Sequence, residues 1–296
     1  MRPLSGEEVA WAAELACVYE VGIEKPGNVS RHYDFGDARY EDFVTSAVAL
    51  GPAFRDAGRA AVGETILRAV TDTRRLVATN TNLGIVLLLA PLAKAACVAA
   101  AAEGLQAATA RVVSGLTVAD ARNAYEAIRR AAPAGLGRVA EHDVGEAAPT
   151  ATLREAMASA RGRDSIAAEY AGDFEITFTV GYEALRRSWD EGGRFSEAIR
   201  TTFLTILARV PDTLIRRKSG MVTAAEVSRR AAEVLEAGGY DSPEGTRRLV
   251  RLRRYLRDAD HARNPGTTAD LVCASLFVFL TEGGMLERLP DLSARW

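Results

Sequence analysis

Apolar side chains recur at helical spacing along most of this chain, and this period is the feature that most limits how it can fold. Residues 7–21 place Val9, Ala12, Ala16 and Cys17 on one face of a helix, because positions three and four apart lie on the same side. We therefore predict an all-α fold. Similar patterns predict further helices over residues 40–50, 63–76, 153–160, 223–237 and 245–256.

Residues 174–180 alternate apolar and polar side chains as a β-strand does. We still predict a helix there, because Phe174 and Phe178 are four apart and a solitary strand would lack a partner for its backbone hydrogen bonds. Two predicted helices begin with the Thr-x-x-Glu spacing of a capping box, formed by Thr152 with Glu155 and by Thr223 with Glu226.

The length of 296 residues fits one large domain or two small ones, and 48% hydrophobic residues are enough for a sizeable core. We predict a single compact domain over residues 1–296, with a cleft formed by helix ends. The loosest stretch, residues 133–149, is either a functional lid or a domain linker.

The formal net charge of -2 provides no global basic field, so we predict that neither nucleic acid nor a membrane surface is a partner. The longest apolar run, residues 83–93, is too short to span a membrane, and the N-terminus lacks the features of a signal peptide. Cys17, Cys97 and Cys273 stand in apolar surroundings without a CxxC pair. These features predict a soluble, cytoplasmic protein with reduced core cysteines. The sequence leaves the oligomeric state open, a homo-oligomer included.

Lysine and asparagine are scarce in this chain. Of 37 basic residues only three are Lys, and Lys25 and Lys218 both fall within short polar clusters between helices. Because Arg is the usual cation here, a retained Lys indicates a site that needs a compact ammonium group. Four of the five Asn residues lie in the same clusters, and only Asn123 does not.

The first cluster spans residues 24–34 and contains a Pro-Gly turn after the first predicted helix. Lys25 is a candidate phosphate contact, and Asn28 is a candidate hydrogen-bond partner for a ligand. Gly27 and Arg31 complete the candidate binding residues of this cluster. The alternative is an ordinary helix end with solvated charges.

The second cluster, Asn80, Thr81, Asn82 and Gly84, leads directly into an apolar helix predicted over residues 85–93. Asn and Thr are good N-cap residues, and the free N–H groups of a helix start attract anions. Capping alone would explain only one of these polar side chains. All four residues are therefore candidate phosphate-binding residues.

The third cluster spans residues 164–170, from Asp164 to Tyr170, with Asp173 and Glu175 after it. Glu169 and Asp173 are four positions apart on one predicted helix face. Like charges at this spacing are unfavourable unless a cation lies between them. Glu169 is therefore a candidate catalytic or Mg²⁺-binding carboxylate, and two exposed carboxylates without a function are the alternative.

The fourth cluster, residues 211–220, combines three consecutive cations with Ser and Gly, a composition typical of phosphate contacts. A solvated helix end is the alternative. Its candidate residues are Asp212 for catalysis and Thr213, Arg216, Lys218 and Gly220 for binding.

The fifth cluster, residues 258–270, places a Pro-Gly turn and two hydroxyls before a buried helix over residues 271–280. Asp260 and Asp270 are candidate ligands for hydrated Mg²⁺, which favours one or two carboxylates plus phosphates. Asp270 is also a candidate catalytic residue, although an acidic residue in a first helical turn also suits the helix dipole. The candidate binding residues are Asn264, Gly266, Thr267 and Thr268.

Four ordered blocks, KPGNV, NTNLG, DTLIRRKSG and NPGTTADL, resemble the triphosphoribosyl-dephospho-CoA synthase family, whose blocks are similar to PKPGLVD, NTHKG, DTNVVSRGG and SPGGSADLLA. The departures at residues 82–83, 218–220 and 267–268 resemble a divergent branch found in archaea and methylotrophic bacteria. The positions that match the family blocks are Lys25, Gly27, Asn28, Asn80, Thr81, Gly84, Asp212, Thr213, Gly220, Pro265, Gly266 and Asp270.

This resemblance implies a pentosyltransferase with ATP as a substrate and Mg²⁺ as cofactor: the ribose 2′-hydroxyl of 3′-dephospho-CoA attacks the anomeric carbon of ATP and expels adenine. A carboxylate would take the hydroxyl proton, and cations would hold the phosphates. One alternative is a transferase acting on a phosphorylated intermediate of a one-carbon coenzyme, tetrahydromethanopterin or methanofuran. Two other classes are a nucleotide-binding protein without turnover and a helical hydrolase with two metal ions.

Overall fold

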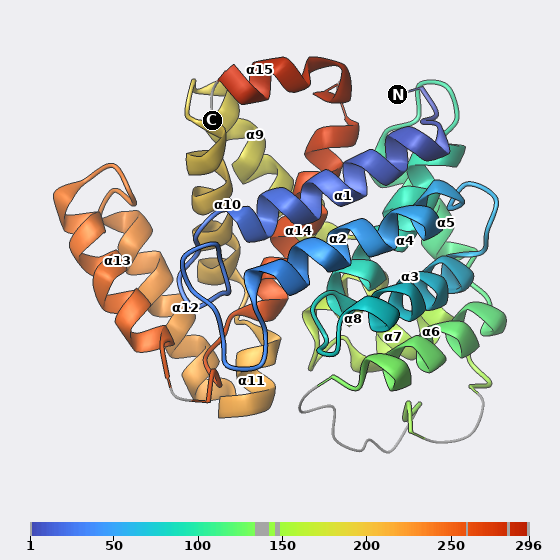
Figure 1. Cartoon of the computed structure of the whole chain (residues 1–296), viewed down its shortest axis with the longest axis horizontal. Coiled ribbons are helices and arrows are strands. Elements are labelled where there is room, and N and C mark those ends of the chain that lie inside the picture. Colours follow the sequence, from blue (N-terminus) through green and yellow to red (C-terminus); the bar gives the residue numbers. More distant parts are fainter. Residues whose placement is uncertain (1, 134–141, 146–148, 259, 283–284, 295–296) are drawn as a thin grey trace.

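A computed structural model of the chain describes residues 2–133, 142–145, 149–258, 260–282 and 285–294 (Figure 1). These ranges form helices and no β-strand, which confirms the all-α prediction. The helices are α1 (Gly6–Gly22), α2 (Tyr40–Arg55), α3 (Val62–Leu76), α4 (Leu83–Val98), α5 (Leu105–Ser114), α6 (Val118–Ala131), α7 (Leu153–Ala160), α8 (Ser165–Ala171), the π-helix η1 (Ile176–Tyr182), α9 (Glu183–Asp190), α10 (Phe195–Arg209), α11 (Thr213–Ser219), α12 (Met221–Glu236), α13 (Pro243–Leu256), α14 (Gly266–Thr281), the 3-10 helix η2 (Met285–Arg288) and α15 (Leu289–Ala294).

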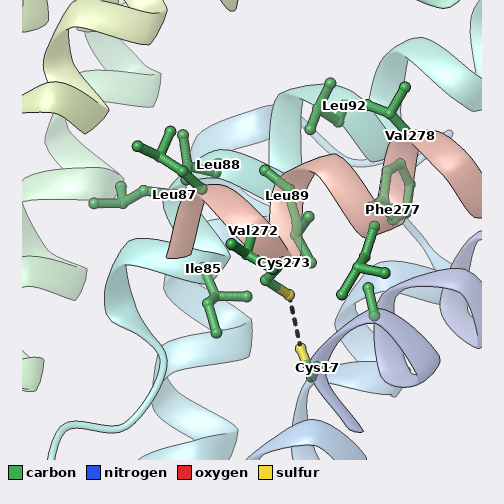
Figure 2. Close-up of a cluster of buried hydrophobic side chains, with 14 of the residues drawn as sticks. Cys17, Ile85, Leu87, Leu88, Leu89, Leu92, Val272, Cys273, Phe277 and Val278 are labelled. Atoms are coloured by element: carbon green, nitrogen blue, oxygen red, sulfur yellow. Dashed lines mark hydrogen bonds between the residues drawn. The ribbon is translucent and has the colours of Figure 1, made fainter. Parts of the chain in front are cut away.

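Two helices, α4 and α14, form the centre of the fold. Both are apolar on nearly every face, and a helix of this kind must be surrounded by other elements. They pack against each other and against α1. Figure 2 shows Leu88 and Leu89 of α4 beside Val272 and Phe277 of α14 in this core.

Amphipathic helices cover this centre. In Figure 1, α1 and α2 run side by side across the molecule, α3 packs beside α2 and against α6, and α12 pairs with α13 at the opposite side. The buried faces of α3 and α6 carry small and branched apolar residues, as helical periodicity requires. Because these helices surround α4 and α14, the N-terminal ends of α4 and α14 lie inside the molecule, where they can line a site.

The three cysteines are free thiols in this structure. Cys17 of α1 and Cys273 of α14 are buried in the core with their Sγ atoms 3.8 Å apart (Figure 2), and Cys97 is half-buried. Burial raises the pKa of the Cys273 thiol well above its usual range, which makes it a poor nucleophile.

The start of α7 agrees with its predicted capping box, because Thr152 accepts a hydrogen bond from the backbone N–H of Glu155. The predicted box at Thr223 is wrong. Helix α12 begins earlier, at Met221, directly after Gly220 with φ +86°, and the Thr223 hydroxyl donates to the carbonyl of Ser219 instead.

The segment that alternates like a strand is helical, as predicted. It contributes the π-helix η1, and Phe174 and Phe178 are both buried. Most of the predicted lid or linker, residues 133–149, lies outside the described residues. Among the helices that the structure describes, none is both long and apolar enough to cross a membrane.

Candidate active site

A cavity of about 670 Å³ opens at the N-terminal ends of α4 and α14. All five polar clusters contribute residues to its wall, and the third contributes Asp164 and Ile166. The sequence-predicted site residues that line it are Asn28, Asn80, Thr81, Asn82, Gly84, Arg216, Lys218, Asp260, Asn264, Gly266, Thr267 and Asp270. Those that do not are Lys25, Gly27, Arg31, Glu169, Asp212, Thr213, Gly220 and Thr268.

Asp270 projects from the first turns of α14 toward the start of α4. A Cβ atom at Gly84 would lie only 2.1 Å from Asp270 Oδ2, so the carboxylate needs a glycine at that position. Within the described residues, the Asp270 carboxylate accepts no hydrogen bond and forms no ion pair. It is thus a half-buried charge in the cavity without a bonded partner.

The surroundings of Asp270 disfavour its negative charge. Burial raises its pKa well above the usual range, and the charges of Glu20, Asp212 and Asp164 raise it further, while Arg217 opposes them. A cation bound beside Asp270 would relieve this repulsion.

The start of α4 also faces the cavity. Its N-cap residue, Asn82, makes no side-chain cap and instead donates from Nδ2 to the hydroxyl of Thr73 at 3.0 Å. Asn80 Oδ1 accepts from the N–H of Leu83 at 3.2 Å, and Thr81 shares a 2.5 Å hydrogen bond with the hydroxyl of Ser46. The N-terminal turn therefore keeps N–H groups that no N-cap side chain covers, which suits an anion.

Asp212, a candidate catalytic residue, does not line the cavity. It is buried outside the cavity wall, where Oδ1 accepts from the N–H groups of Leu214 and Ile215 and Oδ2 accepts from the N–H and hydroxyl of Thr268. Thr213 extends this link, because its hydroxyl lies 3.3 Å from that of Thr267. Asp212, Thr213 and Thr268 thus hold the starts of α11 and α14 together, and the geometry favours a positioning role over substrate contact.

Glu169, a candidate catalytic or Mg²⁺-binding carboxylate, does not line the cavity, and it is not the exposed carboxylate of the alternative either. Its side chain is buried, and its two oxygens each accept a 2.8 Å hydrogen bond, from the N–H groups of Ile176 and Thr177 at the start of η1. Burial raises its pKa to about 7 despite these bonds. Asp173 pairs with Arg154 at 2.9 Å instead of sharing a cation with Glu169. Glu169 caps a helix in this structure.

Lys25, expected at a phosphate, is 1% exposed and lies outside the cavity wall. Its Nζ is 2.9 Å from Glu20 Oε1 and donates to backbone carbonyls of Glu20 and Ile23. With its donors used in this way, Lys25 neutralises Glu20 rather than a ligand.

Glu20 itself is a cavity residue that the sequence analysis missed. Lys25 holds Oε1, while Oε2 accepts no hydrogen bond from the residues described. A usable signal was present: Glu20 is three residues after Cys17 and four after Ala16, and therefore lies on the apolar face of α1.

The remaining residues outside the wall have local explanations. Gly27 has φ +82°, and a Cβ there would lie 2.9 Å from Pro265 Cδ, so turn geometry and close packing both require glycine. Gly220 has φ +86° and ends α11. Arg31 is exposed, with its guanidinium 5.8 Å from the centre of the Tyr40 ring.

Cationic side chains lie along one part of the wall. Arg216 donates to the carbonyl of Gly162 at 2.6 Å, Arg217 pairs with Asp164 at 2.6 Å, and Lys218 is exposed. The sequence analysis missed Arg163 as a cavity residue, and it included Arg217 and Asp164 only as members of the fourth and third clusters. These cations suit phosphate groups.

The rest of the wall is aromatic or apolar. The rings of Phe35 and His261 stack with their centres 3.8 Å apart. Helices α6, α7 and α8 supply an apolar part, formed by Tyr125, Ile128, Leu153, Ala156, Met157 and Ile166. The cavity therefore has a charged part and an apolar part.

No group of three or more His, Cys, Asp or Glu side chains in the described ranges is arranged to hold a metal ion. The donors present are oxygen ligands, which suit Mg²⁺, an ion that takes one or two carboxylates and fills its other positions with water and phosphate. An unpartnered Asp270 among further carboxylates fits such an ion.

Fold and cavity define an all-α protein with a charged cleft at the N-terminal ends of two buried helices. The chain belongs to the CitG family, ATP:dephospho-CoA triphosphoribosyl transferase, whose family model matches residues 6–288. This membership confirms the resemblance seen in the sequence.

Individual relatives agree with this assignment. A Pseudomonas aeruginosa protein named 2-(5''-triphosphoribosyl)-3'-dephosphocoenzyme-A synthase is 35% identical over 116 residues, which cover 39% of this chain and 36% of that protein. A Pseudomonas fluorescens protein of the same name is 32% identical over 111 residues, 38% of each chain. The matched segments thus span just over a third of these curated relatives.

A solved structure is similar over more of its length. The crystal structure described as a triphosphoribosyl-dephospho-CoA synthase from Archaeoglobus fulgidus superposes with a TM-score of 0.61 at 25% identity. The match covers 81% of this chain and 99% of the other.

Proposed function

We propose that this protein transfers the triphosphoribosyl group of ATP to 3′-dephospho-CoA in a Mg²⁺-dependent reaction. The acceptor hydroxyl oxygen forms a bond to the anomeric carbon of ATP, the bond from that carbon to adenine breaks, and adenine leaves. The unpartnered Asp270 carboxylate, in a cavity where two helices begin, is the observation that carries the proposal.

The triphosphate is proposed to lie at the charged part of the cavity. Lys218 is exposed there, and Arg216 contributes from the same helix. The start of α4 adds backbone N–H groups, and the starts of α4 and α14 both add the positive end of a helix dipole. Positive charge stabilises phosphate oxygens without contacts that depend on the base.

Asp270 is the residue proposed to hold Mg²⁺, directly or through water, and Asp260 is a second cavity carboxylate for the same ion. When bound, Mg²⁺ would neutralise part of the triphosphate charge. Gly84 contributes by leaving the space that the Asp270 carboxylate occupies.

Glu20 is proposed to accept the proton of the attacking hydroxyl. Lys25 fixes one of its oxygens, and the other has no hydrogen-bond donor within the described part of the chain. A carboxylate with one oriented and one free oxygen suits general base catalysis. The departing adenine takes up a proton from solvent.

The apolar part of the wall supports a long acceptor. Helices α6, α7 and α8 line the cavity away from the charged residues, and the phosphopantetheine arm of dephospho-CoA needs such an extension. The family description names the same acceptor.

The proposal is tested by incubating the protein with ATP, Mg²⁺ and dephospho-CoA and measuring free adenine by chromatography. We expect adenine in amounts equal to a coupled product detected by mass spectrometry. Adenine without added acceptor would indicate simple hydrolysis. No adenine, with binding of a different phosphorylated metabolite, would favour the one-carbon coenzyme alternative, and nucleotide binding with no turnover of any acceptor would favour a binding protein.

A further inference from the structure

Two asparagines from distant parts of the sequence meet in the cavity wall. Asn28, in the turn after α1, donates from Nδ2 to Oδ1 of Asn264 at 2.9 Å and to the carbonyl of Pro265 at 3.3 Å. The carbonyl of Pro265 can only accept, so it fixes which end of the Asn28 amide is the nitrogen. Asn28 is 7% exposed, and both asparagines line the cavity.

This amide pair is incomplete. Asn28 Oδ1 is buried and accepts no hydrogen bond from the residues that the structure describes. Asn264 uses its Oδ1 as an acceptor, and its Nδ2 has no partner in the same ranges. Buried polar atoms are nearly always bonded, so an open acceptor beside an open donor in a cavity wall indicates a ligand.

Aromatic rings stand in the same wall. His261 stacks on Phe35 with ring centres 3.8 Å apart and planes 13° apart, and both rings are half-buried. The carbonyl of His261 accepts a 3.3 Å hydrogen bond from the N–H of Asn264, which joins the ring and the amide in one turn. A planar ligand can stack on these rings and form hydrogen bonds between its edge and the asparagine side chains.

The geometry points to a purine subsite in which Asn28 and Asn264 read the adenine base of the nucleotide against the Phe35–His261 stack. Asn28 Oδ1 accepts from the 6-amino group, and Asn264 Nδ2 donates to the neighbouring ring nitrogen. This inference rests on the proposed function, because it assigns the base of its nucleotide substrate. The asparagines are neutral, and their open acceptor and open donor match the edge of a base rather than a phosphate. Lys218 Nζ lies 3.4 Å from the carbonyl of His261 and is the cation next to this turn.

Binding of two nucleotides tests the subsite directly. Inosine triphosphate has an oxygen acceptor where ATP has the 6-amino donor, and its N1 carries a hydrogen where N1 of ATP is an acceptor, while the ribose and triphosphate are the same. With Mg²⁺ and no acceptor substrate, calorimetric titration of the wild-type protein should give at least about tenfold tighter binding of ATP, because the mismatch at the 6-position alone removes one hydrogen bond. Asn28→Leu and Asn264→Ser should each bring this ratio close to one, mainly by weakening ATP.

Controls separate loss of recognition from loss of folding. Asn123→Ser, on α6 outside the cavity wall, should keep the wild-type ratio. Affinity for inosine triphosphate should survive in both cavity variants, which shows that they fold. If Asn28→Leu fails to fold, Asn264→Ser, which alters a half-buried side chain, decides the question.

Equal affinities of the wild-type protein for ATP and inosine triphosphate, or a preference that survives both substitutions, would overturn the subsite and leave adenine release unaffected. No binding of either nucleotide would instead contradict the proposed function together with the subsite.

Discussion

Asp212 Oδ2 accepts two hydrogen bonds from one residue, Thr268, from its N–H at 2.7 Å and from its hydroxyl at 2.8 Å. Through its other oxygen the same carboxylate caps α11. One buried side chain therefore fixes the start of α14, two residues before Asp270, relative to the helix that carries Arg216 and Lys218.

Asp212→Ala should lower the free energy of unfolding by about 3 kcal/mol or more, because it leaves several buried donors without an acceptor. Urea unfolding measures this change. Asp164→Ala is the control: Asp164 also caps a helix with Oδ1, but it is half-buried and its Oδ2 pairs with Arg217 instead of a second helix start, so its loss should cost about 1–2 kcal/mol. Equal losses in the two variants would mean that the link to Thr268 adds nothing.

The two lysines in the polar clusters should behave in opposite ways. Lys25→Ala leaves Glu20 buried without its cation and should cost about 3–5 kcal/mol of stability. Lys218→Ala removes an exposed charge and should change stability by less than about 0.5 kcal/mol while weakening ATP binding several-fold. Thermal unfolding and ATP titration of both variants test this contrast, and a stable Lys25→Ala protein would be inconsistent with the buried pair.

Gly84→Ala tests the contact between the start of α4 and Asp270. The added Cβ would overlap Asp270 Oδ2, so the carboxylate must move, and a displacement of about 1 Å is enough to reduce turnover about 100-fold. Gly22→Ala, at the end of α1 with no atom within 4 Å of the added Cβ, should leave turnover unchanged. Normal activity in Gly84→Ala would show that the position of Asp270 is unimportant.

Glu169 predicts a pH dependence of stability. Its pKa is raised from 4.5 to about 7 in the folded protein, so between these values the folded chain keeps a proton that the unfolded chain has lost. Stability should therefore fall as pH rises through this window, by roughly 3 kcal/mol in total from Glu169. Unfolding free energies from pH 4.5 to 7.5 should slope less in Glu169→Gln than in the wild type. Equal slopes in the wild type and in Glu169→Gln would mean that the pKa of Glu169 is not raised, which would contradict this prediction.

Helical periodicity was sufficient to predict the fold, because α4 and α14 are apolar on all sides and the helices around them are amphipathic. The same logic placed Asn82 and Asn264 at the start of a buried helix, where the structure has the cavity. The single-domain assignment for residues 1–296 stays a prediction.

The roles of individual charges were harder to predict. The sequence indicated Glu169 and Asp212 as candidate catalytic carboxylates, but their donors, the N–H groups of η1 and Thr268, come from other turns and other helices. Tertiary contacts of this kind leave no spacing signal. Lys25 was singled out by its rarity, although its partner, Glu20, was already visible on the buried face of α1.

The central claim is that Asp270 binds Mg²⁺ for transfer from ATP, and steady-state adenine release at increasing Mg²⁺ concentration tests it most directly. Asp270→Asn keeps the size of the side chain and removes its charge, so we predict a loss of turnover of at least about 100-fold and a higher Mg²⁺ requirement. Stability should change little or rise, because Asp270 is a charge held among other carboxylates. Near-normal turnover with the wild-type Mg²⁺ dependence would contradict the account. Asp270 would then only interact favourably with the dipole of α14.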